Sequence, residues 1–242
     1  CESSLFLFSV MHTFFSQNIS NEVTLSEIES KHAIKVLRLA SGNNVRLIDG
    51  KGSEAFGAVS NAHPKHCQIQ VDSIIQKEKP TQEIAVALAP TKSNDRTEWF
   101  LEKAIEIGIT HFIPIICENS ERKKFNTERW NKVAISAMKQ SQRLWLPKIS
   151  QPIKMNEFVK ENTYKTRFIA HCEKGEKQEL KDYSDNSKDQ LIIIGPEGDF
   201  SPNEIELALK NSFTPISLGD NRLRTETAGI VACTIMKFGN KN

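Results

Sequence analysis

The stretch Leu191–Leu209, LIIIGPEGDFSPNEIELAL, decides the fold. Its apolar start predicts a fully buried strand, the Gly-Pro-Glu-Gly turn predicts a tight loop, and the remainder predicts a helix. Ser201, Pro202 and Glu204 stand where a capping box with proline in the first turn requires them. A buried strand that runs through a tight turn into a helix is the unit from which parallel α/β sheets are built.

Two glycine turns indicate a ligand site. Gly195 and Gly198 follow the strand above, and they permit close backbone approach at its carboxyl end. The segment Ile216–Ala232, ISLGDNRLRTETAGIVA, repeats the pattern with a turn at Gly219 and a helix opened by Thr225. Because the carboxyl ends of parallel strands meet at one edge of a sheet, we expect the two loops to form one pocket. Neither loop has the P-loop or GxGxxG pattern, which disfavours those nucleotide-binding classes.

Apolar strands alternate with helical patterns through the second part of the chain. This alternation predicts an α/β fold with a parallel sheet covered on both faces. The expected strands are Ile84–Ala89, His111–Cys117, Thr166–His171, Leu191–Gly195 and Thr214–Leu218. The expected helices are Thr97–Ile107, Thr127–Leu144, Asn203–Leu209 and Thr225–Lys237.

The first part of the chain has a different pattern, with short strands between glycine- and asparagine-containing turns. These expected strands are His12–Phe15, Val45–Asp49, Glu54–Val59 and His66–Ile74. One helix, Ser26–Arg38, interrupts them, and one of its faces is expected to lie against the strands: Ile28, His32, Val36 and Leu39. A small β-barrel with one helix is the simplest arrangement.

A polar segment separates the two parts. Gln76–Glu83, QKEKPTQE, is charged and broken by Pro80, which is typical of a linker. We therefore expect one domain at residues 11–78 and a second at residues 79–242.

Composition excludes several classes of protein. The chain has 242 residues, of which 38% are hydrophobic and 26% charged, which is typical of a soluble globular protein and not of a disordered or collagen-like one. Its apolar runs are far shorter than the roughly 20 residues that cross a bilayer. The five cysteines form no Cys-x-x-Cys pair, which favours a reducing cytoplasm over a disulfide framework or structural zinc. Residues 1–10, CESSLFLFSV, precede Met11 and lack the features of a signal peptide, so we interpret them as an upstream remnant.

Charge is unevenly distributed although the net charge is only +2. The segment from Arg122 to Lys148 contains eight basic residues and only one acidic residue, and Trp130 and Trp145 lie among them. A solvated helix face is the usual explanation of such a run, but the interleaved tryptophans make a phosphate-binding face competitive.

Histidines and cysteines give weaker signals. His63, His66 and Cys67 have a metal-like spacing, but they flank a proline in an expected turn, so we expect no metal site. His171 ends an expected strand at the same edge as the glycine loops, where it either borders the pocket or has a structural role. No nucleophile constellation is evident.

The sequence as a whole resembles a known family. IIIGPEGDFSPNE (192–204) and LGDNRLRTETA (218–228) resemble the two cofactor-loop signatures of the RsmE family, the 16S ribosomal RNA uracil-N3 methyltransferases. Four further matches agree in order: ALAPTKSNDRTEWFLEKAIEIGI (87–109), Ser120 with Arg122, KQSQRLWLPKI (139–149) and HAIKVLRLASGNNVRLIDGKG (32–52). The resemblance covers nearly all of the chain from Met11 to Phe238.

The resemblance implies a SPOUT-type fold, in which the carboxyl-terminal α/β domain contains a trefoil knot, a rare exception to unknotted chains. It also implies a PUA-like RNA-binding barrel at the amino terminus, a homodimer, and S-adenosylmethionine as cofactor. The implied cofactor-binding residues are His171, Gly195, Glu197, Gly198, Leu218, Gly219, Leu223, Arg224, Thr225 and Ala228. One departure is Asp199, where the family usually has a second glycine after GPEG.

Methylation of uracil N3 requires removal of the imide proton and stabilisation of the resulting anion. We assign the stabilising charge to Arg222 or Arg224, either on the uracil or on an RNA phosphate. Glu197 is a further catalytic candidate that either accepts from the cofactor or caps its loop, and Glu226 is a candidate partner of an arginine. No residue is identified as the general base.

The target uracil must be presented unpaired or flipped from its stack, so the RNA needs a wider grip than the pocket. The residues expected to hold 16S ribosomal RNA or the small subunit are basic: Arg38, Arg122, Lys123, Lys124, Lys139 and Arg143.

Three other functions compete with this interpretation. The first is a SPOUT methyltransferase acting on another RNA or base atom. The second is an RNA-binding assembly factor without catalysis, which the intact GPEG and LRTETA segments disfavour. The third is a small-molecule α/β enzyme, which the basic run and the expected barrel disfavour.

Overall fold

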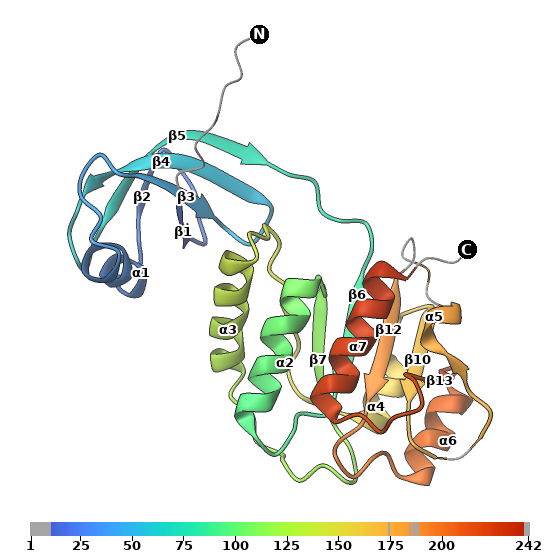
Figure 1. Cartoon of the computed structure of the whole chain (residues 1–242). Helices are drawn as coiled ribbons and strands as arrows, with labels where there is room; N and C mark the ends of the chain where they lie inside the picture. Colours follow the sequence, from blue (N-terminus) through green and yellow to red (C-terminus); the bar gives the residue numbers. More distant parts are fainter. Residues whose placement is uncertain (1–10, 174, 184, 186–188, 240–242) are drawn as a thin grey trace. The chain divides into compact units, whose positions relative to one another are not determined.

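The computed structural model describes residues 11–173, 175–183, 185 and 189–239, so residues 1–10, the expected remnant, lie outside the described residues. The chain divides into two compact units (Figure 1). The amino-terminal unit comprises Cys1–Lys79 and Met138–Leu146, and the carboxyl-terminal unit comprises Pro80–Ala137 and Pro147–Asn242. The sequence analysis assigned all of residues 79–242 to one domain, whereas Met138–Leu146 pack with the amino-terminal unit.

The amino-terminal unit is built on a mostly antiparallel sheet. Its strands are β1 (His12–Phe15), β2 (Glu22–Thr24), β3 (Asn44–Ile48), β4 (Ser53–Asn61) and β5 (Gln68–Gln76). They lie in the order β1-β3-β4-β5-β2, and only the β1–β3 pair is parallel. Alternate side chains, such as Val45 and Leu47 of β3, are buried in a core that also contains Phe14 and Ile69.

The expected helix over Ser26–Arg38 is shorter and wound differently. Ser26 caps α1 (Glu27–Lys31), which continues as a π-helix, η1 (His32–Val36), and Arg38 has a positive φ of 56°. The face expected to be buried is wrong at Ile28 and Val36, which are 74% and 66% exposed, and at the exposed His32, whereas Leu39 packs against the core as expected. The positions that contact the core are Ser30, Ala33, Ile34, Leu37 and Leu39.

The segment Met138–Leu146 adds to this unit through backbone hydrogen bonds. Gly52 N donates to Leu144 O at 2.9 Å, and Leu146 N donates to Gly50 O at 2.9 Å. Gly50 and Gly52 have φ of +72° and +96°, and a Cβ at Gly50 would lie 3.0 Å from the Cβ of Leu146. Glycine at these two positions therefore lets the β3–β4 turn approach the segment.

The carboxyl-terminal unit contains a parallel sheet, as predicted. Its strands are β6 (Ile84–Leu88), β7 (His111–Ile116), β8 (Lys148–Ile149), β9 (Ile153–Lys154), β10 (Thr166–Ala170), β11 (Gln178–Glu179), β12 (Gln190–Ile194) and β13 (Thr214–Ser217). The order is β11-β13-β10-β12-β6-β7-β8, with β9 paired to β7. The short strands β8, β9 and β11 were not predicted, because two residues carry no periodicity.

Helices cover both faces of this sheet (Figure 1). They are α2 (Asn94–Ile107), α3 (Thr127–Gln140), α4 (Met155–Glu161), α5 (Leu180–Tyr183), α6 (Pro202–Lys210) and α7 (Thr225–Phe238), and none of the described helices is long and apolar enough to span a bilayer. On one face, Leu191 and Ile193 pack in a cluster with residues of α4 and α6. On the other face α7 lies so close that a Cβ at Gly229 would be 2.5 Å from the Phe100 ring and 2.9 Å from Leu88.

The turn after β12 begins α6 as the sequence predicts. Ser201 Oγ accepts from Glu204 N at 3.3 Å, and Glu204 Oε2 accepts from Ser201 N at 2.9 Å, which completes the capping box. The second oxygen of the buried Glu204 carboxylate accepts from Glu118 N at 2.9 Å. One carboxylate thus fixes the start of α6 and the loop after β7 together.

A half-buried histidine lies at the start of β7. His111 Nδ1 is 2.8 Å from Tyr164 Oη, and His111 Nε2 is 2.7 Å from Ser150 Oγ. Burial, with a smaller contribution from Lys148, lowers the pKa of His111 from 6.5 to about 4. The imidazole is therefore neutral in the folded protein at pH values where the unfolded chain binds a proton.

This pKa shift predicts a loss of stability in acid. Below pH 6.5 the unfolded chain gains a proton that the folded protein gains only near pH 4, so stability falls over that range and is unaffected above it. After allowance for partial exposure, we expect His111 to account for about 2 kcal/mol of this loss. Urea unfolding at pH 7 and pH 4.5 of the unaltered protein and of His111→Asn measures it. The exposed His63→Asn is the control, and an unchanged pH dependence in His111→Asn would contradict the prediction.

Candidate functional site

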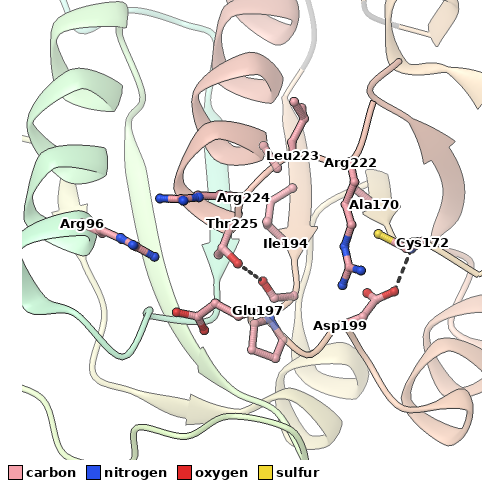
Figure 2. A pocket seen from close by; sticks show the side chains of 13 residues that line it. Arg96, Ala170, Cys172, Ile194, Glu197, Asp199, Arg222, Leu223, Arg224 and Thr225 are labelled. Atoms are coloured by element: carbon pink, nitrogen blue, oxygen red, sulfur yellow. Dashed lines mark hydrogen bonds between the residues drawn. The ribbon is translucent and has the colours of Figure 1, made fainter. Parts of the chain in front are cut away.

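A cavity of about 420 Å³ lies at the carboxyl edge of the parallel sheet, within the carboxyl-terminal unit (Figure 2). Residues that follow β10, β12 and β13 line it, together with one residue of α2. The lining residues are Arg96, Ala170, Cys172, Ile194, Gly195, Pro196, Glu197, Asp199, Arg222, Leu223, Arg224, Thr225 and Ala228. The two glycine loops singled out in the sequence thus meet at one pocket.

The first turn of α7 is fixed to the end of β12 by a buried hydrogen bond. Thr225 Oγ1 donates to Gly195 O at 3.0 Å, and this contact is drawn in Figure 2. A Cβ at Gly195 would lie 3.0 Å from the Phe200 ring, so a larger residue there would press on the core beneath the loop. The pocket wall is therefore closely packed around Gly195.

Three arginines line the pocket, two from one loop and one from a helix. Arg222 and Arg224 lie in the loop between β13 and α7, and Arg96 lies in the first turn of α2. In Figure 2 the Arg222 guanidinium points toward Asp199, whereas Arg224 points toward the side on which Arg96 lies. The pocket thus presents positive charge on two sides, which suits anionic groups and developing negative charge.

Two glutamates and Asp199 place carboxylates at or beside the pocket. Glu197 Oε1 accepts from Lys92 N at 3.1 Å, which ties the loop after β12 to the segment after β6. Glu226 is 7% exposed, and its Oε1 is 3.8 Å from Arg96 Nε. Its Oε2 is buried and has no hydrogen-bond partner among the described residues. Glu226 therefore faces an arginine, as the sequence suggested, at a distance longer than a hydrogen bond.

Four of the implied cofactor residues are not part of the pocket lining. Gly198 faces Asn119, whose Nδ2 donates to Gly198 O at 3.4 Å. Leu218 and Gly219 form the turn after β13, where Gly219 has a φ of +113° that favours glycine. His171 accepts, through its backbone oxygen, from Lys177 Nζ at 2.6 Å. Burial, followed by the Lys177 charge, lowers the pKa of His171, so its imidazole stays neutral near pH 7.

The sequence analysis did not single out Arg96 and Cys172 as site residues. Arg96 stands in an ordinary amphipathic helix pattern, and only the packing of α2 beside α7 brings it to the pocket. Cys172 follows an expected strand at the same edge as the glycine loops, and that position was its only signal. Asp199 was noted as a departure from the family pattern but not as a pocket residue.

The expected RNA-binding residues divide into two groups. Lys123, Lys124 and Arg38 are exposed, and Arg122 is half-buried with its guanidinium donating to Lys92 O at 3.2 Å. Lys139 instead pairs with Glu29 at 2.7 Å and lies over the Phe14 ring, so its charge is largely neutralised within the amino-terminal unit. Burial lowers the pKa of Arg143, which is likewise partly withdrawn from solvent.

His63, His66 and Cys67, whose spacing is metal-like in the sequence, do not point to one common centre: two of them stack on each other and the third is buried. The His63 and His66 rings are stacked with centroids 5.4 Å apart, while Cys67 is a buried free thiol. Among the described residues, no group of three or more His, Cys, Asp or Glu side chains is placed to hold a metal ion.

Comparison with known proteins identifies the family. The model of an RNA methyltransferase domain matches residues 77–237, and that of an RNA methyltransferase PUA domain matches residues 25–72. A ribosomal RNA small subunit methyltransferase E from Rickettsia conorii is 31% identical over 217 residues, covering 88% of each chain. The chain belongs to the ribosomal RNA small subunit methyltransferase E family.

Solved structures of similar proteins have the same fold. A probable rRNA-methyltransferase from Porphyromonas gingivalis is 40% identical with a TM-score of 0.86, and the match covers 92% of this chain and 95% of the other. A family member from Neisseria gonorrhoeae bound to S-adenosyl methionine is 25% identical with a TM-score of 0.83, covering 93% and 96%. The expected α/β fold with a PUA-like domain is thereby confirmed.

The Thr225 hydroxyl provides a test of the pocket wall. We expect Thr225→Val to destabilise the protein by about 1–3 kcal/mol, because it leaves the buried Gly195 carbonyl without its donor. Thr225→Ser keeps the hydroxyl and is the matched control. Thermal unfolding followed by circular dichroism measures the difference, and equal stability of the two variants would show that the hydrogen bond is not needed.

Proposed function

We propose that this chain transfers a methyl group from S-adenosylmethionine to N3 of a uridine in 16S ribosomal RNA of the small ribosomal subunit. The observation that carries the proposal is the convergence of two signature loops and three arginines on one pocket in a chain of this family. Family membership supports cofactor-dependent methylation of ribosomal RNA. The uracil N3 target comes from the resemblance of the signature loops.

The pocket suits the proposed cofactor. Its volume of about 420 Å³ falls within the usual range of small-molecule sites. The proposed contacts are backbone groups and side chains of the two loops. Those that line the pocket are Gly195, Glu197, Leu223, Arg224, Thr225 and Ala228, and the neighbouring candidates are His171, Gly198, Leu218 and Gly219. The family member from Neisseria gonorrhoeae binds S-adenosyl methionine, which supports this assignment.

The proposal includes a trefoil knot in the segment from β12 to α7, as the SPOUT resemblance implies. The strand order is compatible with it, because β12 inserts between β10 and β6 while β13 pairs on the outer side of β10. Thr225 and Gly195, at the two ends of this segment, are joined by a hydrogen bond.

When bound, S-adenosylmethionine supplies an electrophilic methyl group on a positively charged sulfur. The protein must then hold the uracil in line with that group and stabilise the charge that develops on O2 and O4 as N3 loses its proton. Arg224 and Arg222 are the proposed catalytic residues for this charge. Glu197 is a third candidate, whose Oε1 already accepts a backbone N–H and whose other oxygen is available to a ligand or proton.

The proposed substrate needs a further binding surface. We assign it to Arg122, Lys123 and Lys124 in the carboxyl-terminal unit and, separately, to Arg38 in the amino-terminal unit. Lys139 and Arg143 have less weight, because their charges are paired or partly buried. The active unit is proposed to be a homodimer on the basis of the resemblance. Since its substrate is ribosomal RNA, the proposed location is the cytoplasm.

Methyl transfer to unmodified small-subunit particles and to naked ribosomal RNA, followed by nucleoside mass spectrometry, tests the function. We expect 3-methyluridine from the unaltered protein. We expect at least about a hundredfold loss of rate in Arg224→Ala with unchanged far-ultraviolet circular dichroism, because charge stabilisation of the transition state is lost. A different methylated nucleoside would favour another SPOUT target, and full activity of Arg224→Ala would remove that assignment.

The proposed RNA-binding residues predict how the affinity for ribosomal RNA depends on salt concentration. Replacing Arg122, Lys123 and Lys124 with alanine removes up to three phosphate contacts, so the slope of log K against log salt should become shallower by about 2–3. The control replaces Lys139, whose charge is paired with Glu29, and should change the slope little. Filter binding of ribosomal RNA across a salt series measures both, and an unchanged slope in the triple variant would exclude this surface.

A further inference from the structure

Asp199 has a backbone conformation that usually belongs to glycine. Its φ is +61°, in the left-handed region that favours glycine. Asp199 N donates to Pro196 O at 2.9 Å, which closes the turn after β12. Aspartate is one of the few other residues that adopt this region readily, because its short side chain bonds to nearby backbone. This chain therefore places a carboxylate at the pocket without changing the turn.

Both oxygens of that carboxylate are used by backbone donors. Oδ1 accepts from Phe200 N at 2.9 Å, within its own loop. Oδ2 accepts from Cys172 N at 2.8 Å, in the loop that follows β10. Asp199 and Cys172 both line the pocket, so this second bond joins two of its walls. A glycine at position 199 would leave the Cys172 N–H without this acceptor.

A third loop also faces Asp199. Figure 2 shows the Arg222 guanidinium, carried by the loop after β13, directed toward the Asp199 carboxylate. Arg222 is one of the two arginines proposed above to stabilise the negative charge that develops on the uracil. Opposite charges that face one another favour one orientation of a long exposed side chain.

We propose that Asp199 is a positioning residue that joins two loops of the cofactor pocket and faces the third. Its carboxylate fixes the Cys172 loop to the loop after β12 and presents negative charge toward Arg222, a task that glycine, without a side chain, cannot perform. This inference rests on the proposed function, since it assigns the pocket to S-adenosylmethionine.

Asp199→Gly is a suitable variant because glycine adopts a φ of +61° without strain, so the turn should keep its shape. We expect the variant to bind S-adenosylmethionine and its demethylated product about tenfold more weakly each, because a wall that both ligands contact is no longer held in place. If the Asp199 carboxylate instead attracted the positive charge of S-adenosylmethionine, its removal would weaken the binding of S-adenosylmethionine alone. Ser212→Gly, which places glycine at another exposed residue with a positive φ of 62° outside the pocket, is the matched control.

Cys172 supplies a readout that needs no activity. It is exposed and lines the pocket, whereas Cys67, Cys117 and Cys233 are buried. In a Cys1→Ser background, the rate of iodoacetamide labelling at Cys172, followed by peptide mass spectrometry, reports how firmly its loop is held. Without ligand we expect faster labelling in Asp199→Gly than in the unaltered protein and the Ser212→Gly control. Calorimetry with each ligand measures the affinities.

The outcomes test the positioning role of Asp199 separately from the proposed function of the pocket. Faster labelling together with equal loss of affinity for both ligands supports the positioning role. Unchanged labelling, or loss of affinity for the methyl donor alone, overturns it. Absence of S-adenosylmethionine binding by the unaltered protein overturns the proposed function, while the ligand-free labelling rates still decide whether Asp199 holds the loop.

Discussion

The register of the parallel sheet is the constraint on which the pocket depends. Ile194, the last residue of β12, pairs in register with Ala170 of β10 on one side and Leu88 of β6 on the other. Ala170 in turn pairs with Ile216 of β13. Strands that end at the same level must begin their loops at the same level, so the loops need little length to reach one another. Every residue of β12 and β6 is buried, so a change of register would disturb close packing on both faces of the sheet.

The features predicted correctly from sequence are those that neighbouring residues determine. Ser201, Pro202 and Glu204 lie within four residues of one another, and they specify the start of α6 whatever surrounds them. The buried strands are recognisable because both faces of the sheet are covered, which requires apolar residues without alternation. The meeting of the two glycine loops follows from the sheet alone.

The features that sequence did not predict depend on distant packing. Arg96 reaches the pocket because α2 lies beside α7, which its own segment does not encode. Lys139 is neutralised by Glu29, a residue 110 positions earlier, so a count of charges along the chain overstates the basic surface. The buried face of Glu27–Val36 was misjudged because the apolar Ile28 and Val36 were taken to face the core, whereas the small residues Ser30 and Ala33 do.

The chain does not keep its two units separate in sequence, and this affects how the protein can be divided. The amino-terminal unit includes Met138–Leu146, whose backbone bonds to Gly50 and Gly52. A fragment that stopped at Lys79 would lack these partners, and a fragment that began at Pro80 would carry them without the turn that they contact. Exchange of the PUA-like module between relatives is therefore not a simple replacement of the amino-terminal residues. Recombination that preserves both units must carry the nine-residue segment 138–146 along with them.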